Sequence, residues 1–138
     1  MPVLNFKSSA KQSIEMTRRI SNILLDLTSR ILHKDPHLTS IVIEYVDPEN
    51  WIIGGKSLVE HGKSSIYFYI KITDETNTKL EKAEYIDAIF KAFSELLGDL
   101  HDVSYIYIQD VRATSYGYGG KTQEYRFHQH AADLVQDA

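Results

Sequence analysis

The sequence contains one structural unit twice, and this repeat restricts the possible folds more than any other feature of the chain. In each copy a strand-like segment, a long helical segment and a second strand-like segment precede an aromatic residue and a pair of glycines. The two copies are offset by about 64–65 residues. The matching segments are Asp35-Pro36-His37, Ser40-Ile41-Val42-Ile43 and Trp51-Ile52-Ile53-Gly54-Gly55 in the first copy, and Asp99-Leu100-His101, Ser104-Tyr105-Ile106-Tyr107 and Tyr116-Gly117-Tyr118-Gly119-Gly120 in the second. We therefore expect residues 1–138 to form one domain of two pseudo-repeats, at about 2–60 and 61–127, with a short C-terminal tail.

Each copy is expected to contain one long amphipathic helix, because apolar side chains recur every three or four residues. The two apolar stripes are Met16, Ile20, Ile23, Leu24, Leu27 and Ile31, and Ile86, Ile89, Phe90, Phe93 and Leu97. Ser13 is the expected N-cap of the first helix, since its hydroxyl can accept a hydrogen bond from a free backbone amide. Thr78 and Glu81 have the spacing of a capping box, and Gly98 marks the end of the second helix.

Four strands are expected from the apolar runs, at Val3–Phe6, Ser40–Val46, Ile66–Ile72 and Ser104–Val111. Each strand–helix–strand unit is long enough for a parallel pair with a right-handed crossover, which places both helices on the same side. The sequence therefore predicts an α+β fold, in which two tandem β-α-β units form a four-stranded mixed sheet with two helices on one face.

Three of these strands are almost continuously apolar or aromatic, at residues 41–43, 66–70 and 105–108. Such runs indicate strands that are buried on both faces. Two helices cover only one face of the sheet, so the other face is expected to meet another subunit. The alternative is that tyrosines alternate towards water, which could hold for one strand but hardly for three.

Composition excludes several classes of function. The net charge of −4 and the isoelectric point near 5.8 do not favour binding to nucleic acid or to an anionic membrane. The absence of cysteine excludes disulfides, thiol catalysis and cysteine-based metal sites. None of the six histidines has metal-ligand spacing with acidic residues. With no signal-like start and no apolar run of membrane length, we expect a cytoplasmic protein that uses no cofactor or metal.

Pro2 comes directly before the first predicted strand and offers an unusual base. Removal of Met1 would leave Pro2 with a free secondary amine, a group whose reference pKa is about 7.7–8.0. Burial in an apolar pocket would lower that pKa further, towards the value that proton shuttling needs. The alternative is structural, because proline is well tolerated at the first residue of a strand.

Pro2, the doubled unit and the Gly-Gly turns together resemble the tautomerase superfamily. The segments Leu38–Ile43 and Asn50–Gly55 carry the most specific likeness, which covers the chain from Pro2 to about Phe127. The first half is similar to 4-oxalocrotonate tautomerase, and the fused length is similar to macrophage migration inhibitory factor and malonate semialdehyde decarboxylase. The resemblance implies a homotrimer with three sheets around a central channel.

The resemblance also implies roles for single residues. Pro2 matches the catalytic proline, and Trp51 matches an active-site phenylalanine that forms an apolar wall. Gln12, next to Lys11, and Val42 stand where 4-oxalocrotonate tautomerase has the two arginines that hold its dicarboxylate substrate. This departure directs the prediction away from dicarboxylates and towards simpler 2-keto acids.

The pattern of macrophage migration inhibitory factor fits better. Lys34 falls at its active-site lysine, and Tyr105 and Tyr107 fall at a tyrosine and an asparagine that a neighbouring subunit contributes. The remaining candidates for substrate binding are Tyr69, Lys71, Arg112, Tyr116 and Tyr118. Two of the candidate cations could instead have a structural role: Lys34 can complement the negative end of a helix, and Arg112 can hold a turn.

Three functions follow as hypotheses. The leading one is a cofactor-independent tautomerase that acts on a 2-keto acid or its enol, with Pro2 as the base and Tyr105 donating to the enolate oxygen. In the second, a protonated Pro2 is the general acid of a decarboxylase, a dehalogenase or a hydratase. In the third, the chain is a trimeric binding module without catalysis, which retention of Met1 would favour.

Overall fold

The computed structural model describes residues 2–137, with their side chains up to Val135. Met1 and Ala138 lie outside the described residues, and so does the expected removal of Met1. The long elements are β1 (Val3–Ser8), α1 (Ile14–Leu32), β2 (Ser40–Tyr45), β5 (Ile66–Thr73), α3 (Lys79–Leu97) and β6 (Tyr105–Val111). The boundaries of all four long strands agree with the predicted ones to within two residues.

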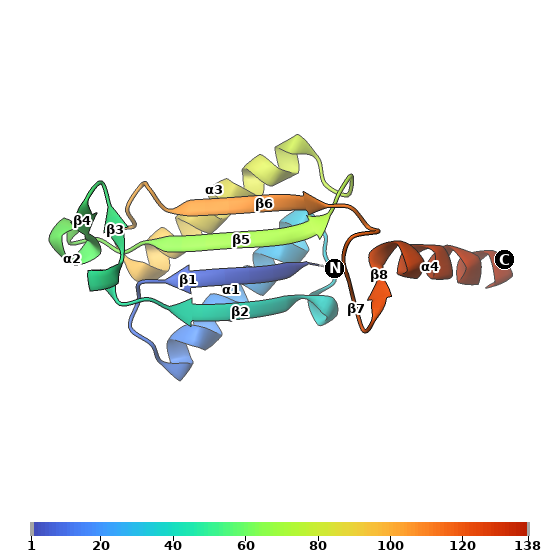
Figure 1. The fold of residues 1–138 in the computed structure, drawn as a ribbon, viewed down its shortest axis with the longest axis horizontal. Coiled ribbons are helices and arrows are strands. Elements are labelled where there is room, and N and C mark those ends of the chain that lie inside the picture. The colour runs from blue at the N-terminus through green and yellow to red at the C-terminus, as the bar shows by residue number, and fades with distance from the viewer. Residues whose placement is uncertain (1, 138) are drawn as a thin grey trace.

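A four-stranded mixed sheet forms the centre of the molecule, in the order β2-β1-β5-β6. β1 is parallel to β2 and β5 is parallel to β6, while β1 and β5 run antiparallel at the centre (Figure 1). Val3 pairs with Ser40 on one side and with Lys71 on the other. The predicted fold class is confirmed, and the antiparallel centre makes the two units point in opposite directions.

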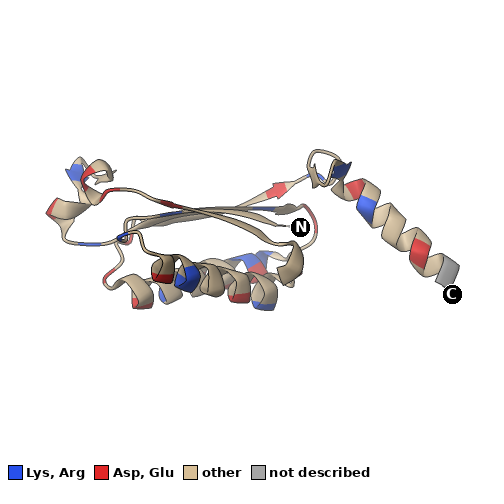
Figure 2. Ribbon diagram, turned by 90° about the horizontal axis from the view of Figure 1, so that it is seen from below, with Lys and Arg blue, Asp and Glu red and all other residues tan. Residues whose placement is uncertain are grey.

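Both long helices lie on one face of the sheet (Figure 2). The Ser13 hydroxyl accepts a hydrogen bond from the amide of Met16, which confirms the predicted N-cap. The Thr78–Glu81 capping box is also present, with both of its reciprocal hydrogen bonds. These caps stabilise the two helix ends by satisfying amides that have no partner within the helix.

The core lies between this helix layer and the sheet. Its largest fully buried side chains include Phe6, Phe68, Phe93 and Tyr85. The Tyr85 hydroxyl lies 2.7 Å from Thr28 Oγ1, so α3 and α1 share a buried hydrogen bond. Burial raises the pKa of Tyr85, which keeps the phenol neutral. Tyr85 is buried on the inner side of α3, whereas the neighbouring Ile86, assigned to the stripe from the sequence, is exposed.

The other face of the sheet is open in the single chain. Val42, Tyr67, Tyr105 and Tyr107 are all exposed there, with between 43% and 65% of each residue's surface accessible. Along β1 and β5, buried residues of the helix-covered face alternate with more exposed residues of the open face. The strands are therefore half-buried in the monomer, although their sequences are typical of strands covered on both sides.

Each unit ends in a small hairpin followed by a helix. The first hairpin module, residues 51–61, contains β3 (Ile52–Ile53), β4 (Lys56–Ser57) and α2 (Leu58–His61). The second hairpin module, residues 116–126, contains β7 (Gly117–Tyr118), β8 (Lys121–Thr122) and the start of α4 (Gln123–Asp137). Gly54-Gly55 and Gly119-Gly120 have φ values of 60° and 79°, and 60° and 78°. This left-handed backbone explains the glycine pairs.

The C-terminal tail expected from the sequence is helical. α4 starts at Gln123 and extends away from the sheet (Figure 1). Among the other elements of residues 2–137, its principal contacts are with β8. Two further one-turn helices, η1 (Pro36–Leu38) and η2 (Pro48–Asn50), lie on either side of β2. Within residues 2–137, no helix combines the length and apolar character needed to cross a membrane.

Candidate active site

Pro2 is buried at the end of the sheet where β1 begins. Its carbonyl oxygen accepts a hydrogen bond from the amide of Ser40 at 3.3 Å, which fixes it beside the start of β2. Across the sheet, Lys71 pairs with Val3, the residue next to Pro2. We call this end of the sheet the Pro2 end. A residue belongs to the site in a single chain only if its element reaches this end.

Lys34 reaches the Pro2 end because α1 runs back along the sheet and stops just before β2 begins. Its Nζ donates to Thr76 Oγ1 at 2.9 Å, on the loop between β5 and α3. Burial lowers the pKa of Lys34, while the carboxylates of Glu81 and Asp110 oppose that shift. A half-buried ammonium held by one hydroxyl is suited to receive an anion.

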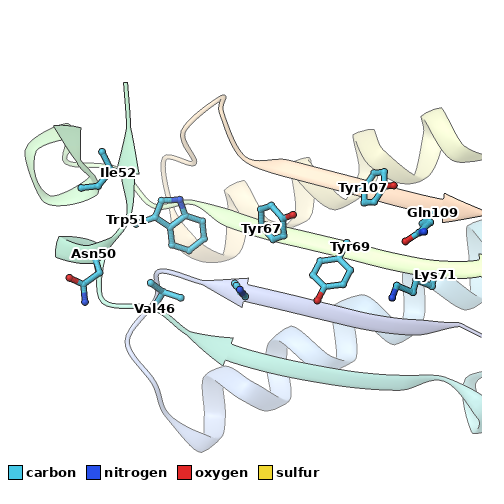
Figure 3. Close-up of a pocket in the computed structure, with 10 residues that line it drawn as sticks. Val46, Asn50, Trp51, Ile52, Tyr67, Tyr69, Lys71, Tyr107 and Gln109 are labelled. Carbon is cyan, nitrogen blue, oxygen red and sulfur yellow. The ribbon is translucent and has the colours of Figure 1, made fainter. Parts of the chain in front are cut away.

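A cavity of about 630 Å³ lies on the open face (Figure 3). Four predicted site residues line it: Trp51, Tyr69, Lys71 and Tyr107. The sequence analysis did not assign the other lining residues, which are Lys7, Val46, Asn50, Ile52, Tyr67 and Gln109. Among the described residues the ammonium of Lys71 has no ion-pair or hydrogen-bond partner, although the neighbouring Lys7 pairs with Glu44 at 3.8 Å. Lys71 is therefore a cation available to a ligand in this cavity.

The second hairpin module also lies at the Pro2 end, because β6 runs towards it. The Tyr116 hydroxyl lies 2.6 Å from Thr73 Oγ1 at the end of β5, and burial raises the pKa of this tyrosine. The guanidinium of Arg126 stacks over the ring of Tyr118, with 3.8 Å between its central carbon and the ring centroid. Arg112 is exposed, and its carbonyl accepts from the amide of Ser115 in a tight turn. Of the predicted residues, Tyr116 and Tyr118 thus lie in the module at this end of the sheet.

Trp51 and Tyr105 lie at the opposite end of the sheet. Trp51 follows β2, whose last residue, Tyr45, pairs with the last residue of β1. Tyr105 is the first residue of β6 and pairs with Tyr67. Ser65 is buried and comes directly before β5 at this end, just as Pro2 comes directly before β1 at the other end. The Oγ of Ser65 lies 2.9 Å from the Oγ of Ser104. Within one chain, Trp51 and Tyr105 therefore lie at the end of the sheet opposite to Pro2.

Three residues near the Pro2 end escaped the sequence analysis: Thr73, Thr76 and Arg126. The two threonines lie at a strand end and in a loop, and nothing in their spacing distinguishes them from ordinary turn residues. Arg126 lies at the same place in the second copy as His61 in the first, so alignment of the copies was the signal that could have found it. Within residues 2–137, no three histidine, aspartate or glutamate side chains are grouped closely enough to hold a metal ion.

No protein-family model matches the sequence, and no curated protein matches it. Solved structures do match. The structure of Pt0534 inactivated by 2-oxo-3-pentynoate is 12% identical with a TM-score of 0.78, and the match covers 90% of this chain and 98% of that one. A fused 4-OT, described as a wild-type symmetric trimer, is 16% identical with a TM-score of 0.73 and coverage of 88% and 96%.

A macrophage migration inhibitory factor-like protein from Entamoeba histolytica has the same fold. It is 17% identical, with a TM-score of 0.72, and the match covers 88% of this chain and 97% of that one. At these identities the likeness establishes the fold. The chain therefore has the fold of the tautomerase superfamily over most of its length.

Proposed function

We propose that this protein is a cytoplasmic, cofactor-independent keto–enol tautomerase that acts on a 2-keto acid or its enol. Its base is the amine of Pro2 after removal of Met1. The observation that carries the proposal is the arrangement at the Pro2 end, where a buried proline, Lys34, Lys71 and the second hairpin module are found at the same end of the sheet. The tautomerase-superfamily fold supports the same function.

The proposal includes a homotrimer, because one chain does not contain a complete site. Trp51 and Tyr105 can face Pro2 only when the opposite end of another copy approaches it. The open face of the sheet supplies the apolar and aromatic surface for this contact. The trimeric state of the similar fused 4-OT supports the same assembly.

In this mechanism the neutral amine of Pro2 removes a proton from the enol hydroxyl or from carbon 3 of the keto form. It returns that proton at the other position, so the reaction is an isomerisation with no net change in atoms. Lys34 or Lys71 binds the carboxylate, and the hydroxyl of Tyr105 from a neighbouring copy donates to the enolate oxygen. Trp51, Tyr107, Tyr116 and Tyr118 exclude water, which keeps the amine neutral.

The site favours a substrate with one carboxylate and an apolar remainder. Gln12 and Val42 stand where 4-oxalocrotonate tautomerase has the arginines that hold a dicarboxylate, and Arg112 is exposed. Lys71, whose element reaches the Pro2 end, brings a cation to the cavity on the open face, where Tyr69 adds an aromatic wall; Pro2 itself does not line this cavity in the single chain. A 2-keto acid with an aromatic or aliphatic side chain fits these properties.

Intact-mass measurement tests the first requirement, since a protein that keeps the mass of Met1 has no Pro2 amine. The second test uses 2-oxo-3-pentynoate, the compound that inactivates Pt0534. A neutral amine can add to its electron-poor alkyne, forming a carbon–nitrogen bond while a proton moves to carbon. We expect one adduct per chain at Pro2, and loss of phenylenolpyruvate ketonisation. A Pro2→Ala variant that ketonises at the parental rate contradicts the proposal.

Nitrogen NMR of Pro2 distinguishes base from acid chemistry. A pKa below neutrality leaves the amine free to accept a proton and supports the tautomerase. A pKa well above neutrality means a protonated amine, which overturns the tautomerase and leaves the decarboxylase or hydratase chemistry. A protein that keeps Met1 but remains trimeric supports the binding module instead.

A further inference from the structure

The two hairpin modules are built with the same hydrogen bonds, 65 residues apart. The carbonyls of Trp51 and Tyr116 accept from the amides of Leu58 and Gln123, at 2.9 and 3.0 Å. The N-cap hydroxyls are equivalent as well: Ser57 accepts from Glu60 at 3.2 Å, and Thr122 accepts from Tyr125 at 3.0 Å. Corresponding positions in the two modules can therefore be compared residue by residue.

At one position the two modules have different side chains that make the same hydrogen bond. In the first module, Nε2 of His61 donates to the carbonyl of Ile53 at 2.8 Å. In the second, Nη2 of Arg126 donates to the carbonyl of Tyr118 at 2.9 Å. A histidine therefore meets the structural need of this position. An arginine adds a permanent positive charge that the hydrogen bond to the carbonyl does not require.

The charge of Arg126 has no counter-ion within the described part of the chain. It is the one arginine of residues 2–135 that is not exposed, and its Nε is buried without a protein acceptor. Its pocket, of about 370 Å³, also holds Lys121 over the ring of Tyr125. The acid of this pocket, Asp133, accepts a hydrogen bond from Gln129 and pairs with neither cation. A half-buried, unpaired cation of this kind is suited to an anionic ligand.

The second hairpin module, which forms this pocket with α4, adjoins the Pro2 end of the sheet and not the opposite end, although Pro2, Lys34 and Lys71 do not line the pocket itself. Thr73, which bonds to the Tyr116 hydroxyl, lies two residues after Lys71, and Lys71 pairs with the neighbour of Pro2. The module with the arginine is therefore the one next to the amine of Pro2. The module with the histidine lies at the end of the sheet that has no such amine.

We propose that Arg126 binds the carboxylate of the substrate at the Pro2 site, with the Tyr118 ring holding the guanidinium in place. This inference rests on the proposed tautomerase function and names its principal anion-binding residue. A planar guanidinium can offer parallel N–H groups to a carboxylate, which neither Lys34 nor Lys71 can do. Lys121 adds a second positive charge to the lining of the pocket.

The matched test is Arg126→His, because it installs the residue that the first module uses at this position. For phenylenolpyruvate we expect KM to rise about tenfold, the effect of losing one charge-assisted contact, with kcat within about twofold of the parent. For the methyl ester of phenylenolpyruvate, which carries no carboxylate charge, we expect an unchanged KM. Arg19→His, an exposed change of the same kind on α1, is the control and should leave both values unchanged.

Equal changes for the acid and the ester mean that Arg126 only supports the hairpin, and they overturn the inference. An unchanged KM for the acid overturns it as well. Arg126→Lys provides a second variant with the charge retained and the planar group lost, and its KM for the acid should lie between those of the parent and Arg126→His. A Lys variant as impaired for the ester as for the acid again indicates a structural role.

A binding measurement that needs no change at Arg126 keeps the inference testable if these variants unfold. In a Pro2→Ala background, addition of phenylacetate should shift the Nε–Hε NMR signal of Arg126, and an unmoved signal overturns the inference. The two proposals fail differently. Parental activity of Pro2→Ala contradicts the tautomerase, whereas an unchanged KM of Arg126→His contradicts only the role of Arg126.

Discussion

The ring of His61 meets the ring of His101 edge-on, with 4.7 Å between their centroids. This contact joins the first hairpin module to the loop that enters β6. His101 is held in turn, since its Nδ1 accepts a hydrogen bond from the amide of Val103 at 2.9 Å. The contact between the two histidine rings therefore helps to fix the first hairpin module relative to the sheet.

His61→Ala should loosen this module, because it removes both the ring contact and the hydrogen bond to Ile53. We expect the free energy of unfolding to fall by about 1–2 kcal/mol. The emission of Trp51, the one tryptophan of the chain, should shift to longer wavelength. His37→Ala is the control, since His37 is the exposed counterpart of His101 in the first copy. Unchanged emission in His61→Ala would show that other contacts hold the module.

Thr28→Val should destabilise the protein by leaving the buried hydroxyl of Tyr85 without its partner. The expected loss in the free energy of unfolding is about 1–3 kcal/mol, measured by urea denaturation. In a Tyr85→Phe background the same substitution should cost much less, because no buried donor is then left unpaired. Equal costs in the two backgrounds would mean that the 2.7 Å contact contributes nothing to stability.

Lys34→Met should change how stability depends on pH. Burial lowers the pKa of Lys34, so the unfolded chain binds more protons than the folded one between that pKa and the ordinary lysine value of about 10.4. The contribution of Lys34 to stability therefore rises with pH in this window and is lost as pH falls through the folded-state pKa. We expect denaturation curves from pH 8 to 10.5 to show a flatter dependence for Lys34→Met. Lys79→Met, an exposed control, should keep the parental slope.

Charges on the open face should prevent assembly. A Val42→Asp/Tyr107→Asp double variant places two carboxylates on the surface that we assign to the subunit contact, where they would be buried without partners. Light scattering should give a mass near three chains for the parent and a smaller mass for the double variant. An Ile14→Asp/Leu80→Asp variant is the matched control, because both residues are more than 70% exposed at the starts of the two long helices. A trimer that survives the change at Val42 and Tyr107 would assign the contact to another surface.

Most of the fold could be predicted from the sequence because its signals are local. The caps at Ser13 and Thr78 and the apolar periodicity of both helices depend on residues within a few positions of one another. Tyr85 was missed because a tyrosine fits the buried side of α3 only with a partner, and that partner, Thr28, is 57 residues away. The helical tail was missed because α4 packs little of its surface against the rest of the chain.

The site could be predicted less well, because it depends on how strands from different units pair. The chemistry of Pro2, Lys34 and Trp51 could be proposed from residue type and resemblance. The separation of Trp51 from Pro2 within one chain follows from the parallel pairing of β1 with β2. The position of Tyr105 at the same far end follows from the antiparallel pairing of β1 with β5, which has no local signature. Lys7 reaches the cavity through the pairing of β1 with β5, and Gln109 through the pairing of β5 with β6, although neither residue belongs to a motif.

Ser65 shows what joining the two units does to the chemistry of the sheet. It precedes β5 as Pro2 precedes β1, but its nitrogen is part of a peptide bond and so has no basic lone pair. In the proposed trimer, each chain would then bring one end with a reactive amine and one end of similar shape that cannot accept a proton. A substitution at the Ser65 end can therefore change the reaction only through the residues that this end brings to the Pro2 end of a neighbouring copy.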